Sequence, residues 1–185
     1  TNATPAAFGA HVANRDCETE IARQYVQVTR PDVLLGGGRT AFNPPMADPC
    51  GMSGNFLAVA VGSGYTYVAN AAELNAAVAA RAGRLLGLFK GGYMTLAALR
   101  PPSSAEPRLF QMAEAAITTL DRVSNRFFLM VEGGLIDLAN HVESVDAQVA
   151  EVLAFDDVVG VVLDWIGASE ERRQHTLLIV LADHE

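Results

Sequence analysis

The sequence predicts an α/β fold, in which a sheet of mainly parallel strands is covered by helices on both faces. Three observations support this prediction. Short apolar runs alternate along the chain with longer segments of helical periodicity. These runs are continuously apolar, which is typical of parallel strands buried on both faces. Half of the 185 residues are hydrophobic and only 18% are charged, so a sizeable core is expected.

The first half of the chain contains three predicted helices and three predicted strands. One helix starts at Thr4 and Pro5, because Thr caps helix N-termini and Pro suits the first helical position. Residues 40–64 are rich in Gly, Pro, Asn and Ser, which predicts a long surface loop. The helices are expected at 5–12, 17–28 and 71–82, and the strands at 32–35, 65–68 and 84–89.

The second half contains two long helical patterns and two further apolar runs. The helix expected at 107–123 has an apolar stripe that starts at Leu109 and Met112. Continuous apolar runs at 127–131 and 176–181 predict two buried strands. Between them we expect one long helix, at 141–166. Its predicted buried side consists of Val145, Val149, Val152, Leu153, Val159 and Val162.

Charge and hydropathy exclude some functions. The net charge of −8 argues against a general surface for nucleic acid or anionic membranes. No apolar run is long enough to predict a transmembrane helix. Cys17 and Cys50 allow one intramolecular disulfide, and two buried thiols remain the alternative.

Two clusters of metal-ligand side chains follow the last two predicted strands. Residues 131–141 are V-E-G-G-L-I-D-L-A-N-H, and residues 181–185 are L-A-D-H-E. The carboxyl ends of neighbouring parallel strands open into one crevice, so the clusters are expected to meet. Asp137 and His141 lie four residues apart and share one face if this segment is helical. Alone, such a pair is also typical of a solvated helix face, but two clusters together favour a zinc site.

These motifs resemble the signature segments of alkaline phosphatases. The resemblance includes V-E-G-G-x-I-D-x-x-x-H, A-D-H, and N-A-T-P-A-A-F-G-A-H-V-A-N-R at 2–15. The stretches D-V-L-L-G-G-G-R and L-L-G-L-F are similar as well, so the likeness spans nearly the whole chain. It implies the three-layer sandwich of that family. It also implies that residues 1–185 are part of a single catalytic domain, truncated at both ends.

The resemblance also implies a role for each polar residue of the motifs. Asp137 and His141 are expected to hold one zinc ion, and Asp183 and His184 a second. Magnesium is expected beside Glu132 and Thr4, with Asn2 where the family has a better magnesium ligand. Arg15 is expected to clamp two oxygens of the phosphoryl group, because a guanidinium matches phosphate bidentately.

The implied reaction is hydrolysis of phosphate monoesters through a phosphoserine, on a serine outside this chain. Residues 1–185 alone are therefore expected to be inactive. The resemblance further implies a homodimer in the periplasm or outside the cell. Two alternatives stay open: a sulfatase or phosphodiesterase of the same superfamily, and a non-catalytic relative that binds metal or phosphate. Asn2 and Leu138, which stands where a basic residue is frequent, keep the second alternative open.

Overall fold

The structure, a computed structural model, describes residues 4–184 and is built around a parallel sheet. The sheet has the order β1–β3–β2, with β1 at Val33–Gly36, β3 at Leu85–Leu88 and β2 at Thr66–Val68. Both neighbours run parallel to β3, whose four residues are all buried. Each of these strands coincides with a strand that the sequence predicts.

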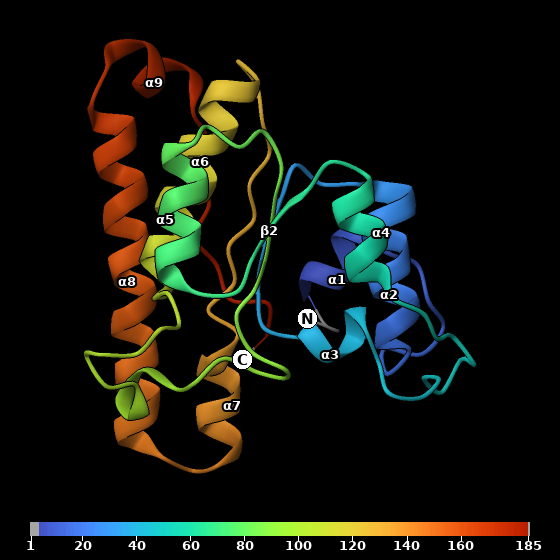
Figure 1. Cartoon of the computed structure of the whole chain (residues 1–185). Helices are drawn as coiled ribbons and strands as arrows, with labels where there is room; N and C mark the ends of the chain where they lie inside the picture. The colour runs from blue at the N-terminus through green and yellow to red at the C-terminus, as the bar shows by residue number, and fades with distance from the viewer. Residues whose placement is uncertain (1–3, 185) are drawn as a thin grey trace.

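Helices cover both faces of this sheet, as the sequence predicts for an α/β fold. On one face, Leu86 and Leu88 pack against α2 (Glu18–Gln24), α3 (Arg39–Phe42) and α4 (Phe56–Gly62). On the other face, Leu85 and Phe89 pack against α5 (Ala71–Ala79) and α6 (Leu109–Val123). Figure 1 shows the resulting layers, with α2 and α4 on one side of the sheet and α5 and α6 on the other. The three-layer arrangement is therefore confirmed.

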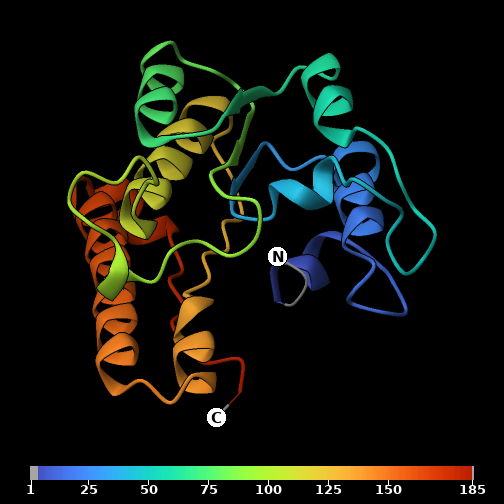
Figure 2. The same cartoon turned by 60° about the horizontal axis from the view of Figure 1, so that its bottom comes forward.

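The remaining helices extend these layers. They are α1 (Thr4–Gly9), the π-helical turn η1 (Tyr25–Thr29), the 3-10 turn η2 (Ala97–Leu99), α7 (Leu135–His141), α8 (Val145–Gly167) and α9 (Glu170–His175). The helix predicted at 17–28 is present as α2 continued by η1. The long helix α8 contacts α6, α7 and η2. Figure 2 shows α7 and α8 side by side, joined by a short turn.

The prediction of a continuous loop at 40–64 is wrong, because α4 and most of α3 lie within it. Asn55 explains the start of α4, since its side chain accepts a hydrogen bond from Ala58 N at 2.9 Å. The apolar residues that follow give this helix a buried side through Phe56 and Ala60.

The long helix predicted at 141–166 is present as α8, but it begins at Val145 and not at His141, because a turn separates it from α7. Glu143 adopts a left-handed conformation with φ 52°, which ends helical geometry. Ser144 then caps α8 by accepting a hydrogen bond from Ala147 N at 3.3 Å. His141 thus ends α7 instead of starting the long helix.

The predicted buried side of α8 is wrong over its first half. Val145, Val149, Val152 and Leu153 are exposed, and Val159 and Val162 are half-buried. The helix instead buries Ala147, Glu151 and Val158. Apolar residues surround α8 on nearly every side, so periodicity alone does not reveal which side packs inward.

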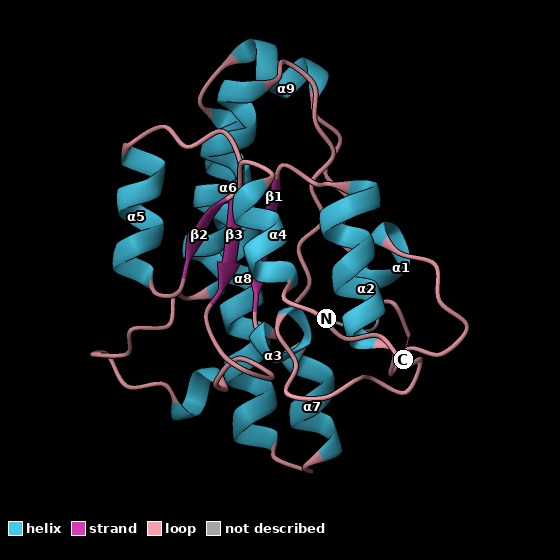
Figure 3. Cartoon of the chain, turned by 45° about the vertical axis from the view of Figure 1, so that its right-hand side comes forward, coloured by secondary structure: helices cyan, strands magenta, loops and turns pink. Residues whose placement is uncertain are grey.

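The two predicted strands before the metal-ligand clusters are extended but unpaired. A strand needs a neighbour for its backbone hydrogen bonds, and within residues 4–184 neither 127–131 nor 176–181 has one. Phe128 and Leu177 are accordingly 73% and 83% exposed. Figure 3 draws both segments as loops beside the sheet. The prediction of buried strands there is therefore wrong for the described part of the chain.

Candidate functional site

The first part of the site is the short helix α7. Asp137 lies in its first turn and His141 in its last, so the two side chains stand one turn apart on one face. His141 Nε2 lies 3.4 Å from Asp137 Oδ2. The segment that carries Asp137 and His141 is therefore helical, which is the condition for the two side chains to share one face.

The last described residues lie against this helix. His184 Nε2 lies 4.0 Å from Asp137 Oδ1 and 3.8 Å from Asp183 Oδ2. Two segments more than forty residues apart thus bring their carboxylates and imidazoles together. Figures 1 and 2 both show the chain ending close to α7.

A third segment joins at the start of α1. The Thr4 hydroxyl donates a hydrogen bond to Asp183 Oδ2 at 3.0 Å, across 179 residues of sequence. This bond is the main reason that the pKa of Asp183 lies below its usual value. Thr4 therefore fixes the orientation of one carboxylate of the site.

Glu132 lies between the same groups and is half-buried. Burial raises the pKa of Glu132, and the nearby carboxylates of Asp183 and Asp137 raise it further, while the Thr4 hydroxyl opposes the shift. Three carboxylates that approach one another are electrostatically unfavourable unless a cation compensates them. The proximity of these three carboxylates therefore favours a divalent cation at this place.

The donor groups fit zinc in chemistry and, for one pair, in spacing. Two ligands of a tetrahedral zinc ion lie roughly 3.3 Å apart, close to the separation of Asp137 and His141. The side chains of Asp137, His141, Asp183 and His184 are between 51% and 74% exposed, so an ion reaches them from solvent. Among residues 4–184, however, no three such side chains already surround one point. Closing on an ion therefore requires these exposed side chains to rotate.

Gly133 and Gly134 are explained by the lack of space for a side chain at these positions and not by their backbone conformation. Gly134 has ordinary helical angles of φ −63° and ψ −11°, which residues other than glycine adopt readily. A Cβ on Gly134 would lie 2.9 Å from Glu132 Oε2, and one on Gly133 would lie 3.1 Å from the Phe155 ring. The two glycines leave room for the Glu132 carboxylate and for α8.

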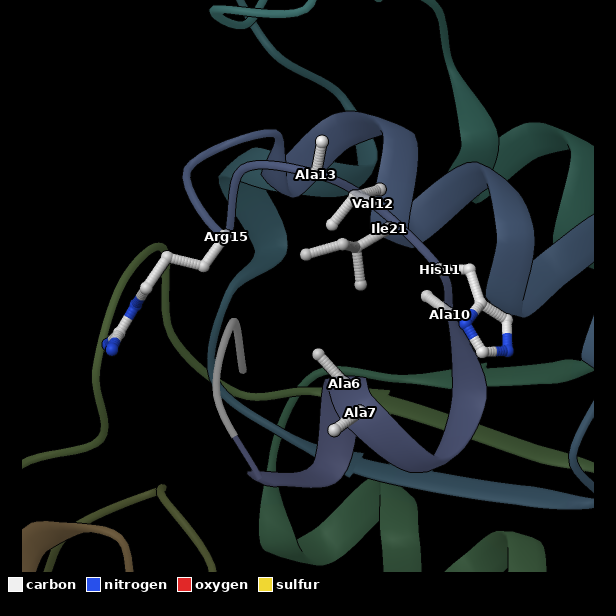
Figure 4. A pocket seen from close by; sticks show the side chains of 8 residues that line it. All are labelled: Ala6, Ala7, Ala10, His11, Val12, Ala13, Arg15 and Ile21. Carbon is white, nitrogen blue, oxygen red and sulfur yellow. The ribbon is translucent and has the colours of Figure 1, made fainter.

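Arg15 is not in contact with this cluster. It lies in the loop between α1 and α2, beside a concavity of about 670 Å³ that is otherwise lined mainly by apolar residues such as Ala6, Ala7 and Ile21. Figure 4 shows its side chain extending away from the others. The guanidinium is exposed and has no ion-pair partner among residues 4–184. Asn2, the remaining predicted site residue, lies outside the described residues.

Two features near the site escape prediction from the sequence. Tyr25 is 6% exposed, and burial, with a contribution from the negative charge of Glu132, raises its pKa to about 12. Cys17 and Cys50 form a disulfide, which the sequence leaves undecided.

Comparisons with known proteins identify the family of this chain. The family model described as alkaline phosphatase matches residues 1–185. The chain is 34% identical to streptomycin-6-phosphate phosphatase of Streptomyces griseus, covering 99% of this chain and 49% of that protein. It is 30% identical to alkaline phosphatase of Escherichia coli strain K12, covering 99% and 46%. The chain thus spans less than half the length of these curated relatives.

Solved structures give the same result. The crystal structure of Thermus thermophilus alkaline phosphatase is 34% identical with a TM-score of 0.78, covering 89% of this chain and 34% of that one. Alkaline phosphatase from the Antarctic bacterium TAB5 is 26% identical with a TM-score of 0.75, covering 89% and 45%. The chain therefore belongs to the alkaline phosphatase family.

Proposed function

We propose that the full-length protein is a metal-dependent phosphomonoesterase and that residues 1–185 supply most of its metal and phosphate ligands. One observation carries this proposal. Asp137, His141, Asp183 and His184 come from two distant segments and meet beside Glu132 and Thr4. Carboxylates and imidazoles in this combination are what zinc binds, and a carboxylate with a hydroxyl suits magnesium.

In this proposal, Asp137 and His141 hold one zinc ion and Asp183 and His184 hold a second. Glu132, Thr4 and Asn2 contribute to a magnesium site. Zinc, when bound, acts as a Lewis acid toward phosphoryl oxygens and lowers the pKa of a hydroxyl group beside it. A structure of the TAB5 alkaline phosphatase mutant His 135 Glu is described with magnesium bound in its M3 site, which supports a magnesium site in this family.

The chain's own residues then bind and orient the substrate. Arg15 binds two oxygens of the phosphoryl group through its guanidinium, whose planar fork matches phosphate bidentately. Thr4 holds the Asp183 carboxylate in place by its hydrogen bond. The nucleophile is a serine outside residues 1–185, and the reaction passes through a phosphoserine. Because these contacts are made to the phosphoryl group, we expect the protein to hydrolyse phosphate monoesters of many different alcohols.

We also propose an oxidising location, in the periplasm or outside the cell, and a homodimer. The Cys17–Cys50 disulfide supports the location, because such bonds persist mainly in oxidising compartments. Within residues 4–184, no helix has the length and apolar character needed to cross a membrane. The homodimer rests on the family resemblance, and sedimentation of the full-length protein tests it.

The test of this function is phosphate release by the full-length protein from a simple aryl phosphate, with zinc and magnesium added after chelation. We expect activity that returns only with metal. His184→Ala and Asp137→Asn should each lose at least about 100-fold in kcat/KM. Asp156→Asn removes an exposed carboxylate on α8 and serves as the matched control.

Two outcomes would contradict the proposal. Activity that survives complete removal of metal would exclude the metal-dependent mechanism. Zinc binding without turnover of any phosphate monoester would instead identify a non-catalytic relative.

A further inference from the structure

We propose that the Cys17–Cys50 disulfide is a positioning element for Arg15, so that phosphate affinity depends on the redox state of this bond. The inference rests on the proposed function only through the role of Arg15 as a phosphate ligand. The evidence lies in how the loop that carries Arg15 is attached to the rest of the molecule.

The loop is tied at its start by Gln24 of α2. His11 N donates to Gln24 Oε1 at 2.7 Å, and Gln24 Nε2 donates to His11 O at 3.0 Å. At its end, Cys17 is fully buried and bonded to Cys50. Between these attachments lie only residues 12–16. Arg15 therefore stands four residues after one tie and two residues before the other.

The far side of the disulfide is itself fixed to α2. Asp48 accepts hydrogen bonds from Cys50 N and Met52 N, both at 2.9 Å, which closes the loop around its carboxylate. The same carboxylate accepts from Glu20 N in the first turn of α2, at 3.0 Å. Cys17 provides no side-chain cap for this helix, so Asp48 caps it from across the disulfide. The bond thus links the loop of Arg15 to a segment that is hydrogen-bonded to α2 through Asp48.

The side chain of Arg15 adds no attachment of its own within the described residues. It is exposed, pairs with no carboxylate among residues 4–184 and points away from the other residues that line the concavity (Figure 4). Only the backbone of the loop then determines where its guanidinium lies. A displacement of about 1 Å at such a group lowers activity by up to about 100-fold, so loss of one tie should be measurable.

The experiment measures the dissociation constant of inorganic phosphate for the full-length, metal-loaded protein by calorimetry, with KM and kcat alongside. Cys50→Ser breaks the bond and leaves Cys17 in its buried place. We expect the phosphate dissociation constant and KM to rise about 10-fold. A dithiol should have the same effect on the parent protein, since it gives two electrons and two protons to the bond, forms two thiols and becomes a disulfide itself. Reoxidation should restore affinity.

A double-mutant cycle separates positioning from general stability. In an Arg15→Ala background, Cys50→Ser should cause no further loss of phosphate affinity, because the group being positioned is gone. Ser169→Ala removes the N-cap of α9 and serves as a destabilised control whose phosphate affinity should not change. If Cys50→Ser does not fold, Asp48→Ala keeps the disulfide and should weaken phosphate binding in the same direction.

Two outcomes would overturn the inference while leaving the proposed function intact. One is an unchanged phosphate dissociation constant after the bond is broken or, where Cys50→Ser does not fold, in Asp48→Ala. The other is that Cys50→Ser lowers phosphate affinity equally in the parent protein and in the Arg15→Ala background. If Arg15→Ala alone binds phosphate as tightly as the parent, then Arg15 is not a phosphate ligand, and both the inference and that part of the proposed function are wrong.

Discussion

Substituting Gly134 by Ala should weaken cation binding without weakening the fold. Gly134 has helical backbone angles that Ala adopts readily, so the backbone tolerates the change. The new Cβ would lie 2.9 Å from Glu132 Oε2, whereas ordinary contacts begin at 3.4 Å. The carboxylate must therefore move by about 0.5 Å, the difference between those two distances.

The size of the effect follows from what the moved group does. The carboxylate is the flexible end of a side chain, so its displacement needs little energy, and the free energy of unfolding should rise by about 0.4–1 kcal/mol because Ala restricts the unfolded chain. A magnesium ligand displaced by this much should lower affinity about 10- to 100-fold, as comparable changes around metal sites do.

Calorimetric titration of the metal-free, full-length protein with magnesium measures this affinity, and urea unfolding measures stability. Gly160→Ala is the matched control, because a Cβ on Gly160 meets no atom within 4 Å. It should gain stability and keep the parent's magnesium affinity. If Gly134→Ala also keeps that affinity, the reasoning that places Glu132 at a cation site is refuted.

Three further predictions concern stability of the full-length protein. Cys50→Ser should lower the free energy of unfolding by about 3.7 kcal/mol, the loop-closure value for a separation of 33 residues; a loss below about 1 kcal/mol in urea unfolding would contradict this. Tyr25 keeps its proton in the folded state up to a pKa of about 12, against about 10 when unfolded. The contribution of Tyr25 to the free energy of unfolding should therefore be complete below pH 10 and decline by about 3 kcal/mol between pH 10 and 12. Tyr25→Phe should remove this pH dependence. Leu74→Ala in the fully buried core beside β2 should lose about 2–5 kcal/mol with an unchanged urea m-value, and a smaller loss would mean that α5 packs loosely.

The sheet and its covering helices are largely predictable from the sequence. Continuous apolar runs locate β1, β2 and β3, and the apolar stripe of α6 predicts Met112 as a buried residue. Asn55 before an apolar run is an available signal for α4, but the Pro- and Gly-rich residues before it favour the loop prediction.

Other parts depend on contacts that a single sequence does not contain. Whether 127–131 and 176–181 become strands depends on a neighbouring strand, and none of the described residues provides one. The side on which α8 packs depends on its partners, because Val145 and Val158 are equally apolar and only the second is buried. The close approach of Thr4 to Asp183, and of both to Glu132, likewise arises from tertiary structure.

The site residues themselves are more predictable than their geometry. The spacing of Asp137 and His141 on one helix follows from local periodicity, and their 3.4 Å separation agrees with it. Arg15 shows the limit of such predictions. Its motif identifies it as a site residue, but its guanidinium lies apart from the cluster in the described structure.

The most direct test of the central claim is anomalous scattering at the zinc absorption edge from crystals of the full-length protein. The claim predicts two zinc peaks, one about 2.0–2.2 Å from ligand atoms of Asp137 and His141 and one at the same distance from Asp183 and His184. Well-diffracting crystals grown with zinc that show no peak beside these four side chains would contradict it.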